Sequence, residues 1–188
     1  MANDAAKVSV GKPKVGGAIY RAPAGTALPT DATTALDAAY KCLGYVSEDG
    51  FKNTPTISTS PIKAWGGDVV LNPETERSET FGMKLIEVLN VDVLKAVYND
   101  SNVSGTLSTG ITVRVNSKES EEAIYVCDMI MTGGVLKRVV VPRTKITAIA
   151  EIDYKDSDAV GYDITLQAMP GGFAAGDDDT HKEYIIEQ

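Results

Sequence analysis

Residues 144–169 read TKITAIAEIDYKDSDAVGYDITLQAM, and their pattern decides the fold. Apolar side chains recur at every second position on both sides of the DSDA tetrapeptide: Ile146, Ala148, Ala150, Ile152 and Tyr154, then Val160, Tyr162, Ile164, Leu166 and Ala168. A period of two over this length predicts two β-strands, each with one apolar face. Because Asp156, Ser157 and Asp158 favour a turn, the stretch predicts an antiparallel hairpin.

The apolar face sets the predicted register of this hairpin. If Tyr154 lies opposite Val160, Ala150 lies opposite Ile164 and all apolar side chains share one side. Glu151 then faces Asp163, and a slip of two residues would bring Asp153 there instead. Like charges directly opposite one another destabilise a sheet. The polar face is therefore either a well-solvated surface or one whose charge has a function; it carries Lys145, Thr147, Ile149, Glu151, Asp153, Asp163, Thr165 and Gln167.

Length and composition predict one β-rich domain. The chain has 188 residues, a net charge of −8, 17 glycines and a single tryptophan. Val, Ile and Thr dominate its periodic segments, which favours a mainly antiparallel β fold. The negative charge argues against a protein that grips nucleic acid through phosphates, but not against a surface that DNA passes without binding.

Cysteine usage and the chain ends predict a soluble protein made in a cytoplasm. Cys42 and Cys127 lack the spacing of metal ligands and are expected to be reduced, small apolar residues. No apolar segment is long enough for a signal peptide or a membrane span.

The rest of the chain predicts more strands and one helix. Valines and leucines at helical spacing over residues 91–98, with Asn90 as N-cap, predict a helix that packs on the sheet through Val93, Leu94, Val97 and Tyr98. Residues 123–131 are apolar on both faces and predict a strand covered on both sides. Pro142 ends a strand or forms an edge bulge. We also expect one or two helical turns over residues 31–39 and strands over 17–22, 41–47, 80–88, 107–116 and 135–141.

Residues 48–79 predict a long hairpin excursion with charged edges. Glu48-Asp49-Gly50 and Gly66-Gly67 are turn signals, and the residues between them are polar and strand-prone. Such an excursion either contacts another molecule or is a loop in solvent. The candidate contact residues are Glu48, Asp49, Phe51, Ile62, Trp65, Glu74, Glu76, Arg77 and Glu79.

The predicted organisation is an N-terminal arm over residues 1–16, a β domain over 17–170 and a C-terminal arm over 171–188. The N-terminal arm is either disordered alone or ordered against a partner. The run Asp177-Asp178-Asp179 is more typical of a solvated segment than of a calcium site.

Catalytic chemistry is weakly represented in the sequence. His181 is the only histidine, and no nucleophile motif or metal-ligand cluster accompanies it. We therefore expect no catalytic residues, no cofactor, no metal and no enzyme activity. A hydrolase that uses a carboxylate pair stays open as a remote alternative.

Three stretches together resemble a known family. They are GAIYRAPAGTALPTD (17–31) with LGYVSEDG (43–50); IKAWGG (62–67) with the Glu/Arg-rich segment, Phe81 and the 91–98 helix; and RVVVPR (138–143) leading into the acidic hairpin. Their order and spacing over residues 17–170 resemble the tail tube (major tail) proteins of long-tailed, non-contractile bacteriophages.

The resemblance implies a β-sandwich or partial barrel flanked by one helix. It implies homohexameric rings that stack into a hollow tube in the virion tail, with the long loop and both arms reaching the adjacent ring. Implied partners are the tape measure, baseplate or distal tail, and tail terminator proteins, and double-stranded DNA passes through the lumen. Glu151, Asp153 and Asp163 would then line the lumen and repel phosphates within a Debye length of about 8–10 Å.

Two other readings remain. A β-rich baseplate or adhesin module could present the 54–79 loop to a host surface, although Trp65 alone is thin support for it. The tube proteins of contractile tails and of type VI-like injection systems share the implied fold. Both readings predict a structural or binding protein without membrane insertion.

Overall fold

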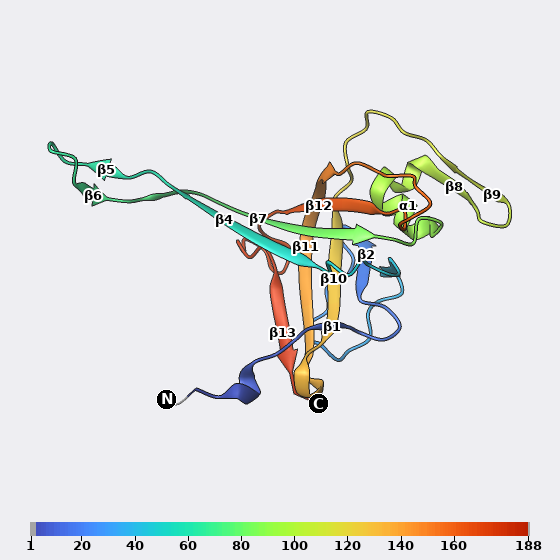
Figure 1. Cartoon of the computed structure of the whole chain (residues 1–188), viewed down its shortest axis with the longest axis horizontal. Coiled ribbons are helices and arrows are strands. Elements are labelled where there is room, and N and C mark those ends of the chain that lie inside the picture. The colour runs from blue at the N-terminus through green and yellow to red at the C-terminus, as the bar shows by residue number, and fades with distance from the viewer. Residues whose placement is uncertain (1–2, 188) are drawn as a thin grey trace.

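The computed structural model describes residues 3–187, which form a nine-stranded antiparallel sheet, two two-stranded sheets and, in the described part, a single α-helix (Figure 1). The nine-stranded sheet has the order β3-β2-β10-β11-β12-β7-β4, with β1 beside β10 and β13 beside β11; β5 pairs with β6, and β8 with β9. The prediction of a mainly antiparallel β domain with one α-helix is confirmed.

The strands are β1 Lys12–Pro13, β2 Ile19–Pro23, β3 Lys41–Cys42, β4 Lys52–Thr59, β5 Ile62–Lys63, β6 Val69–Leu71, β7 Glu74–Leu85, β8 Val103–Thr106, β9 Gly110–Val113, β10 Ala123–Ile130, β11 Leu136–Ile149, β12 Tyr162–Ala168 and β13 Lys182–Ile186. The helix is α1, Val91–Tyr98. Short 3-10 turns span Ala5–Lys7, Asp100–Asn102 and Thr132–Gly134.

Strands β10 and β11 form the centre of the sheet, and a core lies on each of its faces. The larger core includes Phe81, Leu85, Val93, Tyr125 and Ile164. The smaller core includes Ala22, Tyr40, Ile124, Val126 and Val140. Alternate residues of β10 belong to the two cores, so the prediction of a strand covered on both faces is confirmed. Cys42 and Cys127 are free thiols, and burial raises the pKa of Cys127 to about 12.

Helix α1 begins and ends where the sequence predicts. The Asn90 side-chain oxygen accepts a hydrogen bond from the Asp92 amide at 3.0 Å and caps the first turn. Val93, Leu94 and Val97 are buried in the larger core. The ring of Tyr98 meets that of Tyr162 edge to face, with 5.7 Å between centroids. The four packing residues therefore hold the helix against the sheet as predicted.

The predicted register of the β11–β12 hairpin is wrong, by two residues at Ile146 and by one residue at Ile149. Ile146 pairs with Leu166, but a bulge between Ile146 and Ala148 then shifts the ladder, so Ile149 rather than Ala150 lies opposite Ile164. An extra residue in one strand moves the following side chains to the other face, which a strict alternation cannot show. β11 ends at Ile149, and residues 150–161 form a loop from which Ile152 packs back on the core.

A second bulge explains Pro142, which lies inside β11. The β10–β11 ladder shifts between the pairs Tyr125–Val141 and Ala123–Thr144, so β11 has one extra residue around Pro142. A bulge needs no ladder N–H at that point, which suits proline. Of the two predicted alternatives the bulge is correct, and the strand continues for another seven residues to Ile149.

Three local predictions differ from the structure. Residues 31–39 form bends and a turn rather than helical turns, and the Asp31 carboxylate accepts hydrogen bonds there from the amide N–H groups of Thr33 and Thr34. The strand predicted over 41–47 is reduced to β3 and an isolated bridge from Val46 to Leu85. The strand predicted over 107–116 is shorter: residues 107–109 form the turn of the β8–β9 hairpin, β9 ends at Val113, and Val115 beyond it is 78% exposed.

The two arms pair with the domain's own sheet over part of their length. Lys12–Pro13 forms β1 against the end of β10, and Lys182–Ile186 forms β13 against β11. Ser9 and Val10 exchange hydrogen bonds with Thr132. Residues 9–14 thus lie against the domain itself, which neither predicted alternative anticipated. Met1, Ala2 and Gln188 of the predicted arms lie outside the described residues.

Candidate interaction surfaces

The β4–β7 hairpin extends far beyond the body of the domain (Figure 1). Its ladder runs from Lys52–Gly82 to Thr59–Glu74, and β5–β6 continue the excursion. All of residues 59–77 are exposed. The predicted hairpin excursion is therefore present, and its polar alternating residues form a two-stranded arm rather than an irregular loop.

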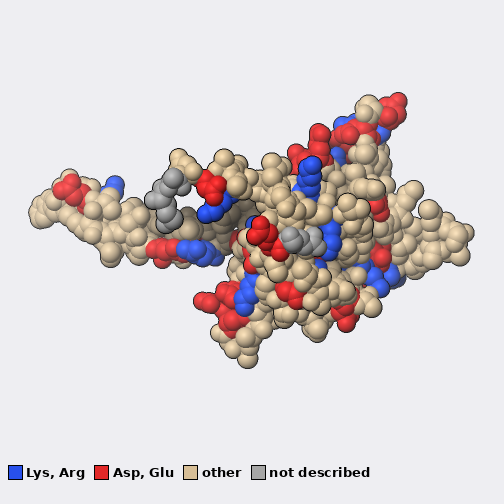
Figure 2. Space-filling model, turned by 90° about the horizontal axis from the view of Figure 1, so that it is seen from below, with Lys and Arg blue, Asp and Glu red and all other residues tan. Residues whose placement is uncertain are grey.

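The end of the arm, residues 62–71, which we call the hairpin tip, carries apolar side chains in solvent. Trp65 is fully exposed at the turn, where the Ala64 amide donates to the Asp68 carbonyl and Gly66 and Gly67 adopt positive φ. More than half of each apolar side chain at Ile62, Val69, Val70 and Leu71 is also accessible. Figure 2 shows little charge along most of the arm. Clustered exposed apolar residues mark interaction surfaces.

Most charged residues predicted for contact are exposed, as a contact role requires. Glu48 and Asp49 lie in the turn before β4. Glu74 and Arg77 form an ion pair with 2.9 Å between nitrogen and oxygen at the start of β7. Glu76 lies on the same strand, opposite Ser58. An ion pair in solvent contributes little energy, so the Glu74–Arg77 pair adds charge to the surface of the arm but little to its stability.

Glu79 and Phe51 point inward instead, so their predicted place in the exposed loop is wrong. The Glu79 carboxylate is only 8% exposed and accepts hydrogen bonds from Asn53 at 2.8 Å, from His181 at 2.9 Å and from Thr180. Phe51 stacks on Phe81, with 5.2 Å between ring centroids. Sequence reasoning missed this contact because the segment that carries His181 is remote in the chain. Its one signal was a lone histidine within an acidic tail.

Burial of the Glu79 carboxyl alone would raise its pKa. The hydrogen bonds from Thr180, Asn53 and His181, together with the His181 charge, outweigh this effect and lower the pKa of Glu79 below its usual value. The C-terminal segment is thus fixed to the base of the arm by an ionised carboxylate.

A continuous polar face covers β4, β7, β12 and the adjoining part of β11. Its side chains are Lys52, Thr54, Thr80, Lys84, Lys145, Asp163, Thr165 and Gln167. A shallow cavity of about 250 Å³ opens on it. Asp163 lies opposite Lys84 rather than Glu151, so the predicted clash of carboxylates does not occur. Glu151 and Asp153 are exposed in the 150–161 loop, which leads into the start of β12. The face therefore carries both signs of charge.

The same side of the sheet, where β10 pairs with the first part of β11, contains a buried ion pair that the sequence did not reveal. Arg138 is 1% exposed, and its guanidinium donates to both oxygens of Asp128 at 2.6 and 2.8 Å. It also donates to the carbonyl oxygens of Asp31 and Thr34. Arg138 therefore fixes the 24–40 loop over the smaller core.

Residues 3–187 contain no group of three or more metal-binding side chains. In the same residues no helix is long and apolar enough to cross a membrane. The surface features of the described residues are an extended apolar tip, an edge strand and a broad polar sheet face.

Comparison with protein families agrees with this geometry. The sequence profile described as phage tail tube protein matches residues 1–184, nearly the whole chain. The chain belongs to the phage tail tube protein family. Among curated proteins, no sequence matches it. Membership makes the chain a structural component of the virion tail, and the family resemblance seen in the three sequence stretches is confirmed.

Proposed function

We propose that this tail tube family member closes into six-membered rings that stack into a hollow tube, through which phage DNA is ejected. The observation that carries the proposal is the β4–β7 arm, whose apolar tip has nothing to pack against within residues 3–187. A long arm with exposed apolar side chains is costly in an isolated monomer but is stabilised by burial against another copy.

Ring closure follows from the sheet order. β4 is the last strand at one end of the sheet and β3, only two residues long, is the last at the other. An edge strand can continue hydrogen bonding into a neighbouring subunit, and a closed ring removes edges that would otherwise aggregate. Pairing of β4 with the next copy would join the polar faces of β4, β7 and β12 into one lining.

The lumen would present Asp163 on the sheet face and Glu151 and Asp153 in the loop beside it. Carboxylates repel phosphates at short range, while Lys52 and Lys84 leave the lining only partly acidic. A mixed polar lining without an extended basic stripe would let DNA slide without prolonged binding.

The remaining roles are those expected for a tube. The chain would be made in the bacterial cytoplasm, polymerise along a tape measure protein between distal tail and terminator proteins, and perform no catalysis. The tail would be of the long, non-contractile kind.

Negative-stain electron microscopy of the purified protein over a range of concentrations tests the proposal. We expect hollow tubes or six-fold rings at high concentration. A protein that stays monomeric at every concentration and binds carbohydrate would instead support the adhesin reading, and rings of another symmetry would contradict the hexamer.

A further inference from the structure

We propose that the hairpin tip of one copy binds in a cavity beside the C-terminal end of α1 on a second copy, with Trp65 as the anchor. This inference rests on the proposed tube and specifies which two surfaces join successive rings. It assigns a receptor site on this chain to a surface that otherwise has no role.

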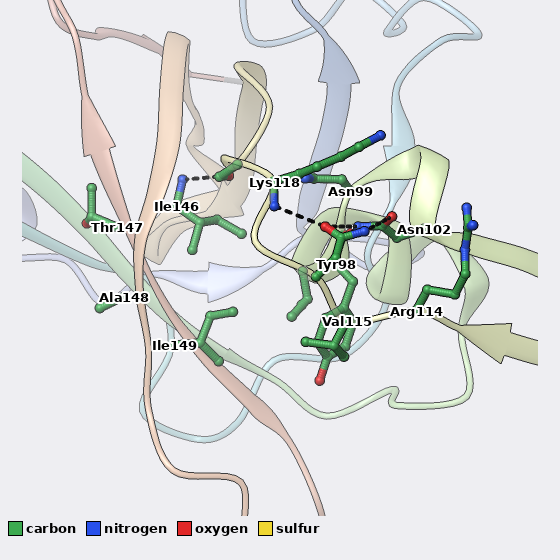
Figure 3. A pocket seen from close by; sticks show the side chains of 13 residues that line it. Tyr98, Asn99, Asn102, Arg114, Val115, Lys118, Ile146, Thr147, Ala148 and Ile149 are labelled. Carbon is green, nitrogen blue, oxygen red and sulfur yellow. Dashed lines mark hydrogen bonds between the residues drawn. The ribbon is translucent and has the colours of Figure 1, made fainter.

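The cavity has a volume of about 310 Å³ and lies between α1, residues 114–120 and the end of β11. Figure 3 shows Ile146 and Ile149 pointing from β11 toward Tyr98 and Val115 on the opposite wall. Ile149 is 41% exposed and Val115 is 78% exposed, so both offer apolar surface to an incoming side chain. The bulge after Ile146 is what turns Ile149 to this side.

The floor of the cavity is a rigid network of amides. Asn102 and Asn116 hydrogen-bond to each other, with 2.8 Å from the Asn116 nitrogen to the Asn102 oxygen. Asn102 also donates to the Tyr98 carbonyl at 2.8 Å, and Asn99 donates to the Glu119 carbonyl at 2.9 Å. A site held in this way loses little conformational entropy when it is filled.

The head-to-tail stacking of rings in a tube favours this cavity as the binding site of the tip. Rings that stack with one orientation make head-to-tail contacts, so a feature protruding at one end meets the opposite end of the next copy. The tip lies at one end of the molecule's longest axis, whereas α1 and the β8–β9 hairpin lie toward the other end (Figure 1). The cavity beside α1 is thus on the side that an approaching tip would reach.

The two surfaces are chemically complementary. The tip offers the Trp65 indole, and the cavity offers apolar walls together with amide oxygens that retain a lone pair for the indole N–H. Asp68 follows Trp65 in the same turn, and Arg114 and Lys118 border the cavity. Tryptophan buried in a pocket at the centre of a contact is a common form of interface hot spot.

Cysteine cross-linking within assembled tubes tests the pairing. An Ala64→Cys/Val115→Cys chain, which keeps the Trp65 anchor, should give a ladder of oligomers on a denaturing gel after treatment with a short bismaleimide. Each single variant, which keeps Cys42 and Cys127, should give no ladder. Tubes visible in the microscope but without a ladder would overturn this inference and leave the proposed function intact.

The fluorescence of the wild-type chain gives a second test that requires no cysteine. Trp65 is the only tryptophan, so its emission should shift to shorter wavelength when tubes form. Val115→Asp should raise the critical concentration for assembly about tenfold. Leu89→Asp, at an exposed position outside the cavity, should not. Unchanged emission in tubes contradicts the inference, and absence of tubes at all concentrations contradicts both proposals.

Discussion

At the scale of single residues, Arg138 is expected to contribute most to stability. Replacing it with methionine leaves the Asp128 carboxylate buried without its partner and frees the Asp31 and Thr34 carbonyls. Removing one member of a buried pair costs about 3–5 kcal/mol. We expect Arg138→Met to lower the free energy of unfolding by that amount in urea titrations. Arg77→Met, which removes a pair in solvent, is the matched control and should cost less than about 1 kcal/mol.

The Glu79 cluster predicts a pH-dependent hold on the C-terminal segment. Because the pKa of Glu79 is lower in the folded protein, its contribution is present above about pH 4.5 and is lost as pH falls through the folded pKa. Glu79→Gln should therefore reduce stability by about 1–3 kcal/mol near neutral pH and by much less in acid. Thermal unfolding from about pH 3 to about pH 7 measures this difference. A difference between the two proteins that does not change with pH would refute the prediction.

Residue-level sites could be predicted only where their partners are near in sequence. Asn90 caps α1 two residues away, so its role was readable from the chain. Glu79 contacts His181 and Thr180, which lie about a hundred positions later in the chain. In the sequence it stands among alternating charged residues that resemble those of any exposed strand. Nothing local distinguishes a carboxylate that folding will bury from one that stays in water.

At the scale of elements, the pair Asp163–Lys84 predicts how the polar face responds to charge. Asp163→Lys places two lysines directly opposite one another on β12 and β7. Like charges opposite in a sheet cost roughly 0.2–1 kcal/mol relative to a neutral pair. We expect the lysine variant to lose about that much stability in urea titrations, and more at low salt than at high salt. Asp163→Asn should lose less, and an equal loss in both variants would show that the cross-strand charge is irrelevant.

The hairpin arm allows assembly to be separated from folding. Replacing residues 62–71 with a two-residue turn keeps the β4–β7 ladder and removes the apolar tip. The shortened chain should unfold at the same temperature as the full chain, because the removed residues bury nothing in the core. Electron microscopy should show that it no longer forms tubes. Tubes of normal length would show that the tip has no part in assembly.

The presence of the strands and the helix was predictable because periodicity and caps are local features of the sequence. The register of the strands was not predictable. The alternation in 144–169 predicted two antiparallel strands correctly. The bulges after Ile146 and around Pro142 each add one residue to β11, which pairs with β10 on one edge and with β13 and then β12 on the other. These pairings involve the whole sheet, and so the opposing partner of Asp163 could not be predicted from the hairpin alone.

At the scale of the whole molecule, the charge around Asp163 should decide how easily DNA moves through the tube. Replacing Glu151, Asp153 and Asp163 with lysine changes the lining by six charge units per subunit and adds cations beside Lys84. Each ion pair with phosphate releases counterions, so DNA would bind the lumen strongly at low salt and weakly at high salt. Phage with this variant should form intact tails but eject DNA slowly, and added salt should restore the rate.

The neutral variant Glu151→Gln/Asp153→Asn/Asp163→Asn separates the loss of carboxylate repulsion from the attraction of the added lysines. It removes the three carboxylates but adds no cation, so ejection should be slowed less than in the lysine variant and should depend less on salt. Ejection can be followed by the release of fluorescently stained DNA from receptor-triggered phage. If the lysine variant also ejects at the wild-type rate in low salt, these three residues do not face the DNA. The lumen would then be lined by another surface of the ring.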